Sequence, residues 1–189
     1  MSRWKPNTQS RLEQAALNLY HEQGYGQTTV AQIAERAGLT ERTFFRYFAD
    51  KREVLFGWQE DLLATCVVAI ETAPPTATPI EMIMTAWEVV VPMFQERHAL
   101  VRQRQAVIAA NPELQERELL KLAALTSAIA DALRKRAVTD QVASLAANIG
   151  DLVFKTAYAR WVDEPDAPDL SKLIQMSFEQ LKGIIAADS

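Results

Sequence analysis

The sequence of 189 residues contains one cysteine, Cys66, and only 6 glycines. A single thiol cannot form a disulfide within its own chain, so a fold held together by disulfides is excluded. With 49% apolar residues and no low-complexity tract, the composition argues against a largely disordered chain. Nothing in the sequence resembles a secretory signal, so we expect a globular, cytoplasmic protein.

Long hydrophobic runs are also missing. A membrane-spanning helix needs roughly 20 apolar residues. The apolar stretches around Val67 and Val90 are interrupted by Glu71 and Glu88. We therefore expect no insertion into a membrane.

Side chains suited to catalysis are scarce. The chain has two histidines, His21 and His98, besides its single cysteine, and it shows no phosphate-binding loop and no metal-ligand spacing. An enzyme is the disfavoured class, and we expect no catalytic residue, no metal and no cofactor.

Charge is distributed unevenly along the chain. Residues 1–52 carry eight lysines and arginines against five acids, a net charge of +3, whereas residues 53–189 carry −7. A basic segment attached to an acidic body suits binding of a polyanion, although a solvated surface would look the same.

Apolar residues recur at helical spacing, and no run of alternating polarity indicates a strand. We predict an all-α fold of about nine helices, with an N-terminal three-helix helix-turn-helix DNA-binding domain at 1–52 and a C-terminal helical ligand-binding and dimerisation domain at 53–189. The expected helices lie at about 7–23, 30–37, 41–47, 51–72, from 79 onward with a kink at Pro92, and at 97–109, 112–136, 140–162 and 169–186.

The segment 29–47 has the spacing of a helix-turn-helix. Thr29 and Gln32 form a capping box for one short helix, Gly38 ends it, and Thr40 caps the next. On the second short helix Arg42, Phe45 and Arg46 share one face. That face suits the major groove, where Arg42 can donate to guanine and Phe45 can contact a thymine methyl group.

Other residues near this helix suit phosphate contacts. Thr40, Tyr47 and Lys51 carry donors for the DNA backbone. Core packing is the alternative role for residues of this segment: Ile33, Leu39, Phe44 and Phe48 are expected in the core, and Tyr47 lies between core edge and phosphate contact. Arg3, Trp4 and Lys5 would suit a minor-groove arm, but a frayed terminus is the favoured interpretation.

The N-terminal segment resembles the TetR family over about residues 9–56. The resemblance rests on residues of matching type and spacing over three helices: Leu12, Ala15-Ala16, Leu19-Tyr20, Gly24-Tyr25, Thr28-Thr29-Val30, Ile33-Ala34, Ala37-Gly38-Leu39-Thr40, Phe44, Tyr47-Phe48 and Lys51. The resemblance implies that the following residues contact DNA: Thr29, Thr40, Arg42, Thr43, Phe45, Tyr47 and Lys51. Arg46 is added as a further candidate because it lies on the same helix face. Where the family often has tyrosine, this chain has Phe45, which cannot donate to a phosphate.

The same resemblance implies a homodimer formed by helices 140–162 and 169–186. Small residues on the first and apolar residues on the second suit close helix packing: Ala143, Ala147 and Gly150, then Phe178 and Leu181. Burial of these residues inside the chain's own core is the alternative.

A small-molecule inducer is expected in the second domain. Candidate ligand-binding residues are Trp58, Trp87, Met93, His98, Asn148 and Phe154, although ordinary core or solvated roles compete for each. Family habit and aromatic content suggest an apolar or amphipathic ligand, either a flat aromatic molecule or an acyl thioester. We expect a repressor that binds palindromic double-stranded operator DNA as a homodimer and is released by this ligand. A regulator switched by a protein partner is the alternative.

Overall fold

The computed structural model describes residues 8–166 and 168–186, and the expected arm at Arg3, Trp4 and Lys5 lies outside them. Within the described residues the chain forms nine α-helices and one short 3₁₀ helix, with no strand, which confirms the all-α prediction. The same residues include no helix long and apolar enough to cross a membrane. The described part of the chain divides into two compact units, residues 8–58 with 102–118, and residues 59–101 with the described residues of 119–186.

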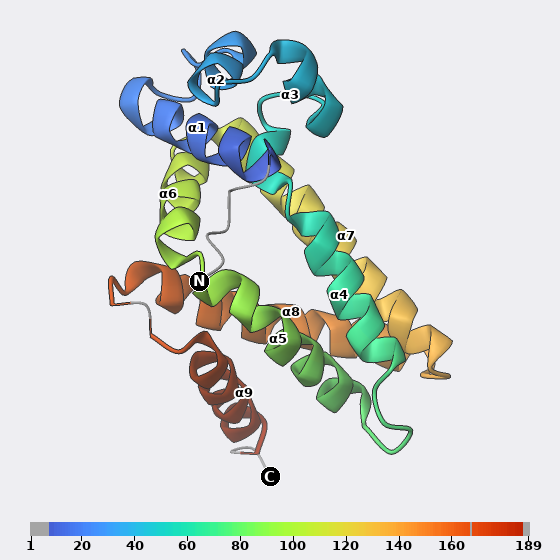
Figure 1. Cartoon of the computed structure of the whole chain (residues 1–189). Helices are drawn as coiled ribbons and strands as arrows, with labels where there is room; N and C mark the ends of the chain where they lie inside the picture. Colours follow the sequence, from blue (N-terminus) through green and yellow to red (C-terminus); the bar gives the residue numbers. More distant parts are fainter. Residues whose placement is uncertain (1–7, 167, 187–189) are drawn as a thin grey trace, which may run out of the picture. The chain divides into compact units, whose positions relative to one another are not determined.

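The first unit contains α1 (Thr8–Gln23), α2 (Val30–Arg36) and α3 (Glu41–Tyr47). Helix α2 packs against both α1 and α3 (Figure 1). Gly24 follows α1 with φ of 88°, a left-handed conformation that glycine adopts without steric cost, and its N–H donates to the carbonyl of Tyr20 at 3.1 Å. Gly38 ends α2 in the same way with φ of 65°.

Both short helices of this unit begin at their expected caps. The Thr29 hydroxyl accepts from the backbone of Gln32, whose side chain accepts from the Thr29 N–H, which completes the capping box. Thr40 accepts from the backbone N–H of Thr43 at the start of α3. Each cap satisfies a backbone donor that a seven-residue helix would otherwise leave unpaired.

The prediction of one continuous helix over 51–72 was wrong. The structure has a turn at Lys51, a 3₁₀ helix η1 (Glu53–Phe56), and then α4 (Gln59–Glu71). Val54, Leu55 and Phe56 are all buried. Three consecutive side chains point in different directions around a helix, so their burial shows that η1 is enclosed by its neighbours on more than one side.

The second unit contains α4, all of α5 (Pro79–Gln95) and the two C-terminal helices α8 (Asp140–Asp163) and α9 (Leu170–Ala186). Helix α5 packs against α4, α8 and α9, and its start carries the expected signals: the Thr78 cap, Pro79 in the first turn and the capping-box acid Glu81. Pro92 lies inside α5, which continues to Gln95.

Helices α6 (His98–Ala109) and α7 (Pro112–Lys135) contribute to both units. Residues 102–118, which include the turn between them, belong to the compact unit of α1–α3. The predicted boundary between a DNA-binding domain ending at residue 52 and a ligand-binding domain starting at residue 53 stays a prediction. The compact units show how the chain packs, and not which part binds DNA or a ligand.

Candidate nucleic-acid interface and ligand site

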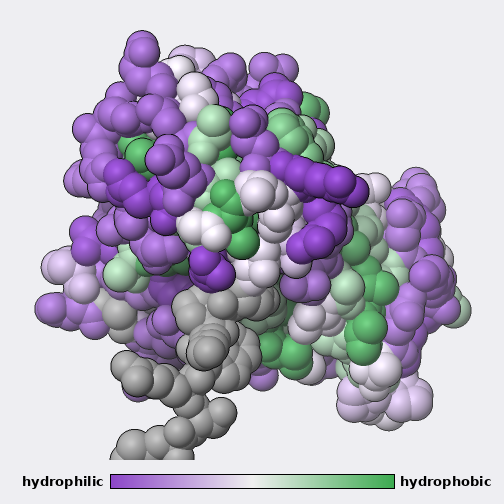
Figure 2. All heavy atoms as spheres, turned by 45° about the horizontal axis from the view of Figure 1, so that its top comes forward, coloured by the Kyte–Doolittle hydropathy of each residue, from purple (hydrophilic) through white to green (hydrophobic). Residues whose placement is uncertain are grey.

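Helix α3 has one buried face and one exposed face. Phe44 and Phe48 are buried, with ring centroids 5.6 Å apart. On the other face Phe45 is 55% exposed and Tyr47 is 41% exposed, and Arg42 and Arg46 are exposed beside them. Figure 2, which brings the region of α2 and α3 forward, shows a mostly hydrophilic surface there with small apolar patches. The structure thus places the residues predicted to read bases on an accessible surface.

Arg42 differs from the other arginines near α3. Arg36 forms a bidentate ion pair with Glu22 at 2.8 and 2.7 Å, and the Arg52 guanidinium donates to Asp50 at 2.6 Å. Within residues 8–166 and 168–186, Arg42 has no hydrogen bond or ion pair. Its donors are therefore available to a ligand.

Arg46 and Tyr47 form a pair on the same helix. The Arg46 guanidinium carbon lies 5.1 Å from the centroid of the Tyr47 ring, and its Nη2 donates to the Tyr47 hydroxyl at 3.4 Å. Hydrogen bonds from Arg46 and from Thr8 lower the pKa of Tyr47 from its ordinary value. The two side chains present a cation and a hydroxyl together.

Thr29, Thr40 and Thr43 all lie at helix starts. The Thr40 and Thr43 hydroxyls are 3.0 Å apart, so one donates to the other. Thr29 is exposed at the start of α2, and Gln23 donates from α1 to the Gln32 side chain of its capping box at 3.0 Å. These contacts fix the hydroxyls in place before any DNA arrives.

The Lys51 ammonium is already engaged. It donates to the carbonyls of Tyr25 at 2.8 Å, Gly26 at 3.4 Å and Thr28 at 2.9 Å, and it lies 4.4 Å from the Tyr25 ring centroid. Lys51 therefore holds the turn between α1 and α2. Its expected phosphate contact stays a prediction, and that contact would replace at least one of these three bonds.

Arg11 provides a support that the sequence reasoning missed. Its guanidinium donates to the carbonyl of Ala37, the C-cap residue of α2, at 2.5 Å. A cation at a helix C-terminus is stabilised by the helix dipole. The turn between α2 and α3 is thus fixed from α1, and no local sequence pattern reports a contact across 26 positions.

Trp58 lies in the first compact unit, beside Arg104 of α6. The Arg104 guanidinium is 5.0 Å from the Phe56 ring centroid and 5.6 Å from that of Trp58. It donates to the Leu55 carbonyl at 2.6 Å and forms an ion pair with Glu118 at 2.9 Å. This buried arginine joins η1 to α6 and α7 within the unit.

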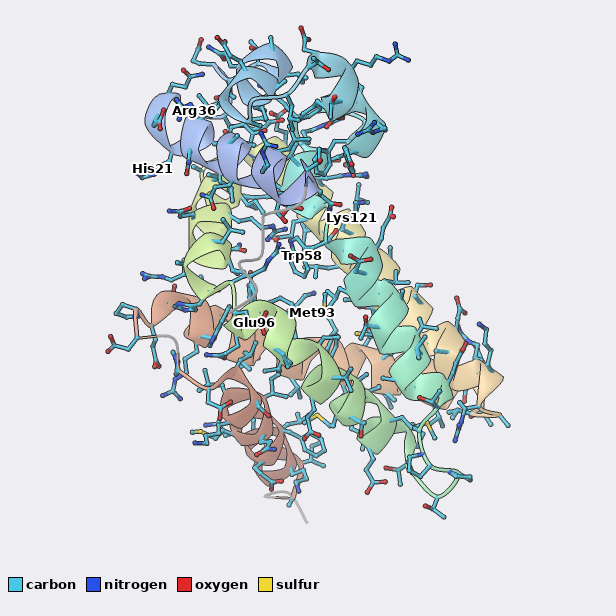
Figure 3. The ribbon with its side chains drawn as sticks, viewed as in Figure 1. His21, Arg36, Trp58, Met93, Glu96 and Lys121 are labelled. Carbon is cyan, nitrogen blue, oxygen red and sulfur yellow. The ribbon has the colours of Figure 1, made fainter. Side chains whose placement is uncertain are left out.

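Three other predicted ligand residues meet in an aromatic cluster of the second unit. The Trp87 and Phe154 rings stack with centroids 4.5 Å apart, and both residues are buried. His98 is buried, and its Nε2 lies 3.0 Å from the Trp161 carbonyl oxygen. Met93 is half-buried near the end of α5, where Figure 3 labels it together with Glu96.

Asn148 is separate from this cluster. It lines an open groove of about 470 Å³ between α7 and α8, whose wall includes Leu119, Arg134, Ser144 and Lys155. Arg134 forms ion pairs with Asp131 and Asp140, so its charge is already compensated. The predicted ligand residues therefore do not form one site within either unit.

The small residues predicted to face a dimer partner are buried in the chain's own core. Ala143 and Ala147 are at most 1% exposed, and a Cβ atom on Gly150 would lie 2.5 Å from Cγ2 of Ile83 on α5. The alternative of internal packing thus holds for these three, because they let α8 approach α5. Phe178 and Leu181 are half-buried on α9.

A different stripe on α8 is open to solvent. Val142, Leu145 and Leu152 are 48%, 63% and 55% exposed, and Ile149 lies half-buried between the last two. Their spacing of three, four and three residues is the spacing of an interface between helices. The sequence prediction selected small residues on this helix and so missed the stripe. The spacing of its apolar residues, alternately three and four positions apart, would have indicated it.

Comparisons with known proteins agree with this architecture. The family model "Bacterial regulatory proteins, tetR family" matches residues 13–57, and the model "MftR C-terminal domain" matches residues 77–185. The regulator TcmR of Streptomyces glaucescens is 37% identical over 84 residues, which are 44% of this chain and only 37% of TcmR. The regulator MftR of Mycobacterium tuberculosis is 24% identical over 183 residues, which are 95% of this chain and 91% of MftR.

Solved structures share the fold. The Thermus thermophilus repressor FadR, crystallised with lauroyl-CoA, has a TM-score of 0.56 and 22% identity, and the match covers 92% of each chain. The two family models together include the helix-turn-helix and more than half of the chain. The protein therefore belongs to the TetR family of bacterial transcriptional regulators.

Proposed function

We propose that this regulator is a cytoplasmic, non-enzymatic repressor that binds a palindromic operator as a homodimer and is released by a small molecule. The observation that carries the proposal is the exposed face of α3, where Arg42 is unpaired among the described residues and Phe45 lies beside it. A protein has no packing reason to expose such a ring next to a free guanidinium. Duplex DNA satisfies both groups in its major groove.

The residues around α3 divide into two roles. Arg42 reads guanine and Phe45 contacts a thymine methyl group, because these groups discriminate between base pairs. The other candidates contact phosphates and set the register: Thr29, Thr40, Thr43, Arg46, Tyr47 and Lys51. The Arg46–Tyr47 pair suits a phosphate because both donors converge.

We further propose that the homodimer forms through α8 and α9. The exposed stripe of Val142, Leu145, Ile149 and Leu152 supplies the apolar contact on α8, and Met176 and Ile184, which are 47% and 71% exposed, extend it on α9. Apolar surface of this kind is typical of interfaces between subunits. Phe178 and Leu181 of α9 remain predicted interface residues at the edge of this apolar surface.

Sedimentation of variants tests this interface. Leu145→Glu places a charge in the stripe and is expected to give monomers, whereas Leu120→Glu, at a similarly exposed position on α7, is expected to leave the dimer intact. A Leu145→Glu protein that sediments as a folded dimer would remove α8 from the interface.

Release by a ligand completes the proposal. Two recognition helices that read one face of DNA must be roughly 34 Å apart, or a multiple of that distance. A ligand that moves α4 changes this separation and so weakens binding. The complex of FadR with lauroyl-CoA supports a small-molecule trigger in this family. In the competing proposal a protein partner of the acidic body acts as the trigger.

Selection of genomic DNA by the purified full chain is the decisive experiment. The selected fragments are expected to share a palindrome, and added small molecules are expected to dissociate the complex. Fragments without a shared sequence would refute the operator, and release only by a protein fraction would favour the partner-switched alternative.

A further inference from the structure

Glu41 is an acidic side chain on the face of α3 that carries the proposed base-reading residues. Glu41 and Phe45 are four residues apart, so their side chains are neighbours on the helix surface. Arg42 and Arg46 form the adjacent row with the same spacing, and all four residues are exposed. A carboxylate therefore lies beside the ring and the guanidinium groups that are proposed to contact DNA.

The charge of Glu41 is not neutralised within the described part of the chain. Other acids of the same compact unit have cationic partners: Glu22 forms an ion pair with Arg36 at 2.7 Å. Asp50 forms an ion pair with Arg52 at 2.6 Å. The Glu41 carboxylate, by contrast, has no hydrogen bond and no ion pair with any described residue. Its acceptor oxygens are therefore available to a ligand.

Stabilisation of α3 itself is the alternative role for Glu41. An acid in the first turn of a helix interacts favourably with the helix dipole. The same charge, however, approaches the phosphates when α3 binds DNA, and it loses part of its hydration there. Helix stabilisation alone thus leaves a cost in the complex, and a hydrogen-bond donor on the DNA would offset that cost.

The major groove offers few donors to a carboxylate. They are the N4 amino group of cytosine and the N6 amino group of adenine. Adenine also presents the N7 acceptor beside its amino group, and this acceptor repels the second carboxylate oxygen. Guanine presents the acceptors N7 and O6, and thymine presents the acceptor O4 and a methyl group. A carboxylate therefore favours cytosine over the other three bases.

We propose that Glu41 determines operator specificity by accepting a hydrogen bond from the N4 amino group of a cytosine. Because Glu41 and Arg42 are consecutive on α3, this cytosine lies in the base pair of the guanine read by Arg42 or in the adjacent pair. Glu41 also rejects guanine and thymine at this position, since their acceptors repel a carboxylate. The inference rests on the proposed function in assuming that α3 enters the major groove.

Base preference at each position of the operator half-site tests the proposal. The full-length protein is mixed with a pool of duplexes in which each base pair of the selected operator is varied, and the bound and free fractions are sequenced. One position, at or next to the position that Arg42→Ala relaxes, is expected to prefer cytosine over guanine and thymine by roughly five- to hundredfold. A role in helix stabilisation alone would give no such preference.

Substitutions of Glu41 provide a matched series. Glu41→Gln keeps the shape of the side chain and is expected to move the preference from cytosine to adenine, because an amide accepts from N6 and donates to N7. Glu41→Ala is expected to abolish the preference and to tighten binding of the disfavoured bases, because the repulsion is removed. Glu35→Gln removes the same charge from an exposed position of α2 and is the control, which is expected to keep the preference for cytosine.

The proposal is overturned if the wild-type protein shows no cytosine preference at these positions, or if folded Glu41→Gln and Glu41→Ala proteins change the affinity for all bases alike. If a variant fails to fold, the preferences of the wild-type protein decide the question. A selected palindrome whose reading is relaxed by Arg42→Ala, but unchanged in both Glu41 variants, would refute this inference and leave the proposed function intact. A protein that selects no shared sequence would refute both together.

Discussion

Replacing Gly150 by alanine tests where α8 packs. The added Cβ would lie 2.5 Å from Cγ2 of Ile83, and Ile83 is fully buried on α5, so a core side chain or the helix must shift to accept it. Overpacking of this kind costs about 1–3 kcal/mol. Alanine in place of glycine in a helix interior returns about 1 kcal/mol. We therefore expect Gly150→Ala to lower the free energy of unfolding by about 1 kcal/mol.

Gly183 on α9 is the matched control. A Cβ there meets no atom within 4 Å, so Gly183→Ala is expected to stabilise the protein by up to about 1 kcal/mol. Urea denaturation followed by circular dichroism measures both variants, at several protein concentrations because dimer dissociation adds to the stability. A Gly150→Ala protein as stable as Gly183→Ala, with a weakened dimer, would refute internal packing and return Gly150 to the subunit interface.

Three further changes probe other contacts. Glu118→Gln leaves the buried Arg104 without its counter-ion and is expected to lower the free energy of unfolding by about 2–3 kcal/mol. Lys135→Gln, in the exposed pair with Glu71, is the control and should lower it by less than about 1 kcal/mol. Equal effects of the two variants would contradict a stabilising buried pair. Ala137 has φ of 62°, so Ala137→Gly should raise the melting temperature by removing about 1 kcal/mol of strain, and a lower melting temperature would argue against that conformation. Lys51→Ala is expected to weaken binding to all DNA sequences alike. It should also reduce the slope of log affinity against log salt concentration by about one unit. A Lys51→Ala protein with reduced stability and an unchanged slope would assign Lys51 to the turn at Tyr25 alone.

Local signals in the sequence predicted most helix boundaries. Thr29 with Gln32 and Thr78 with Glu81 form the expected capping boxes, because such caps depend on residues three positions apart. The segment after Lys51 could not be predicted in the same way. Val54, Leu55 and Phe56 in its 3₁₀ helix are all buried, and this burial depends on tertiary contacts that no local sequence pattern reports.

The candidate site shows the same division between local and distant information. Helical spacing alone separated buried Phe44 from exposed Arg42 and Phe45 on α3. Spacing could not show that Gly150 faces Ile83 on another helix, or that the Lys51 ammonium is bound to carbonyls more than twenty positions away. Residue type indicates what a side chain can do, and the tertiary contact determines what it does.

The affinity of Arg42→Ala for the selected operator tests the central claim most directly. Fluorescence anisotropy at fixed salt, with each operator base pair varied in turn, is expected to show a loss of about 1–3 kcal/mol on the operator and relaxed selectivity at one base pair. Arg160→Ala removes the same charge at an exposed position of α8 and should change neither the affinity nor the selectivity. An Arg42→Ala protein that keeps the wild-type affinity and selectivity would contradict base reading by α3.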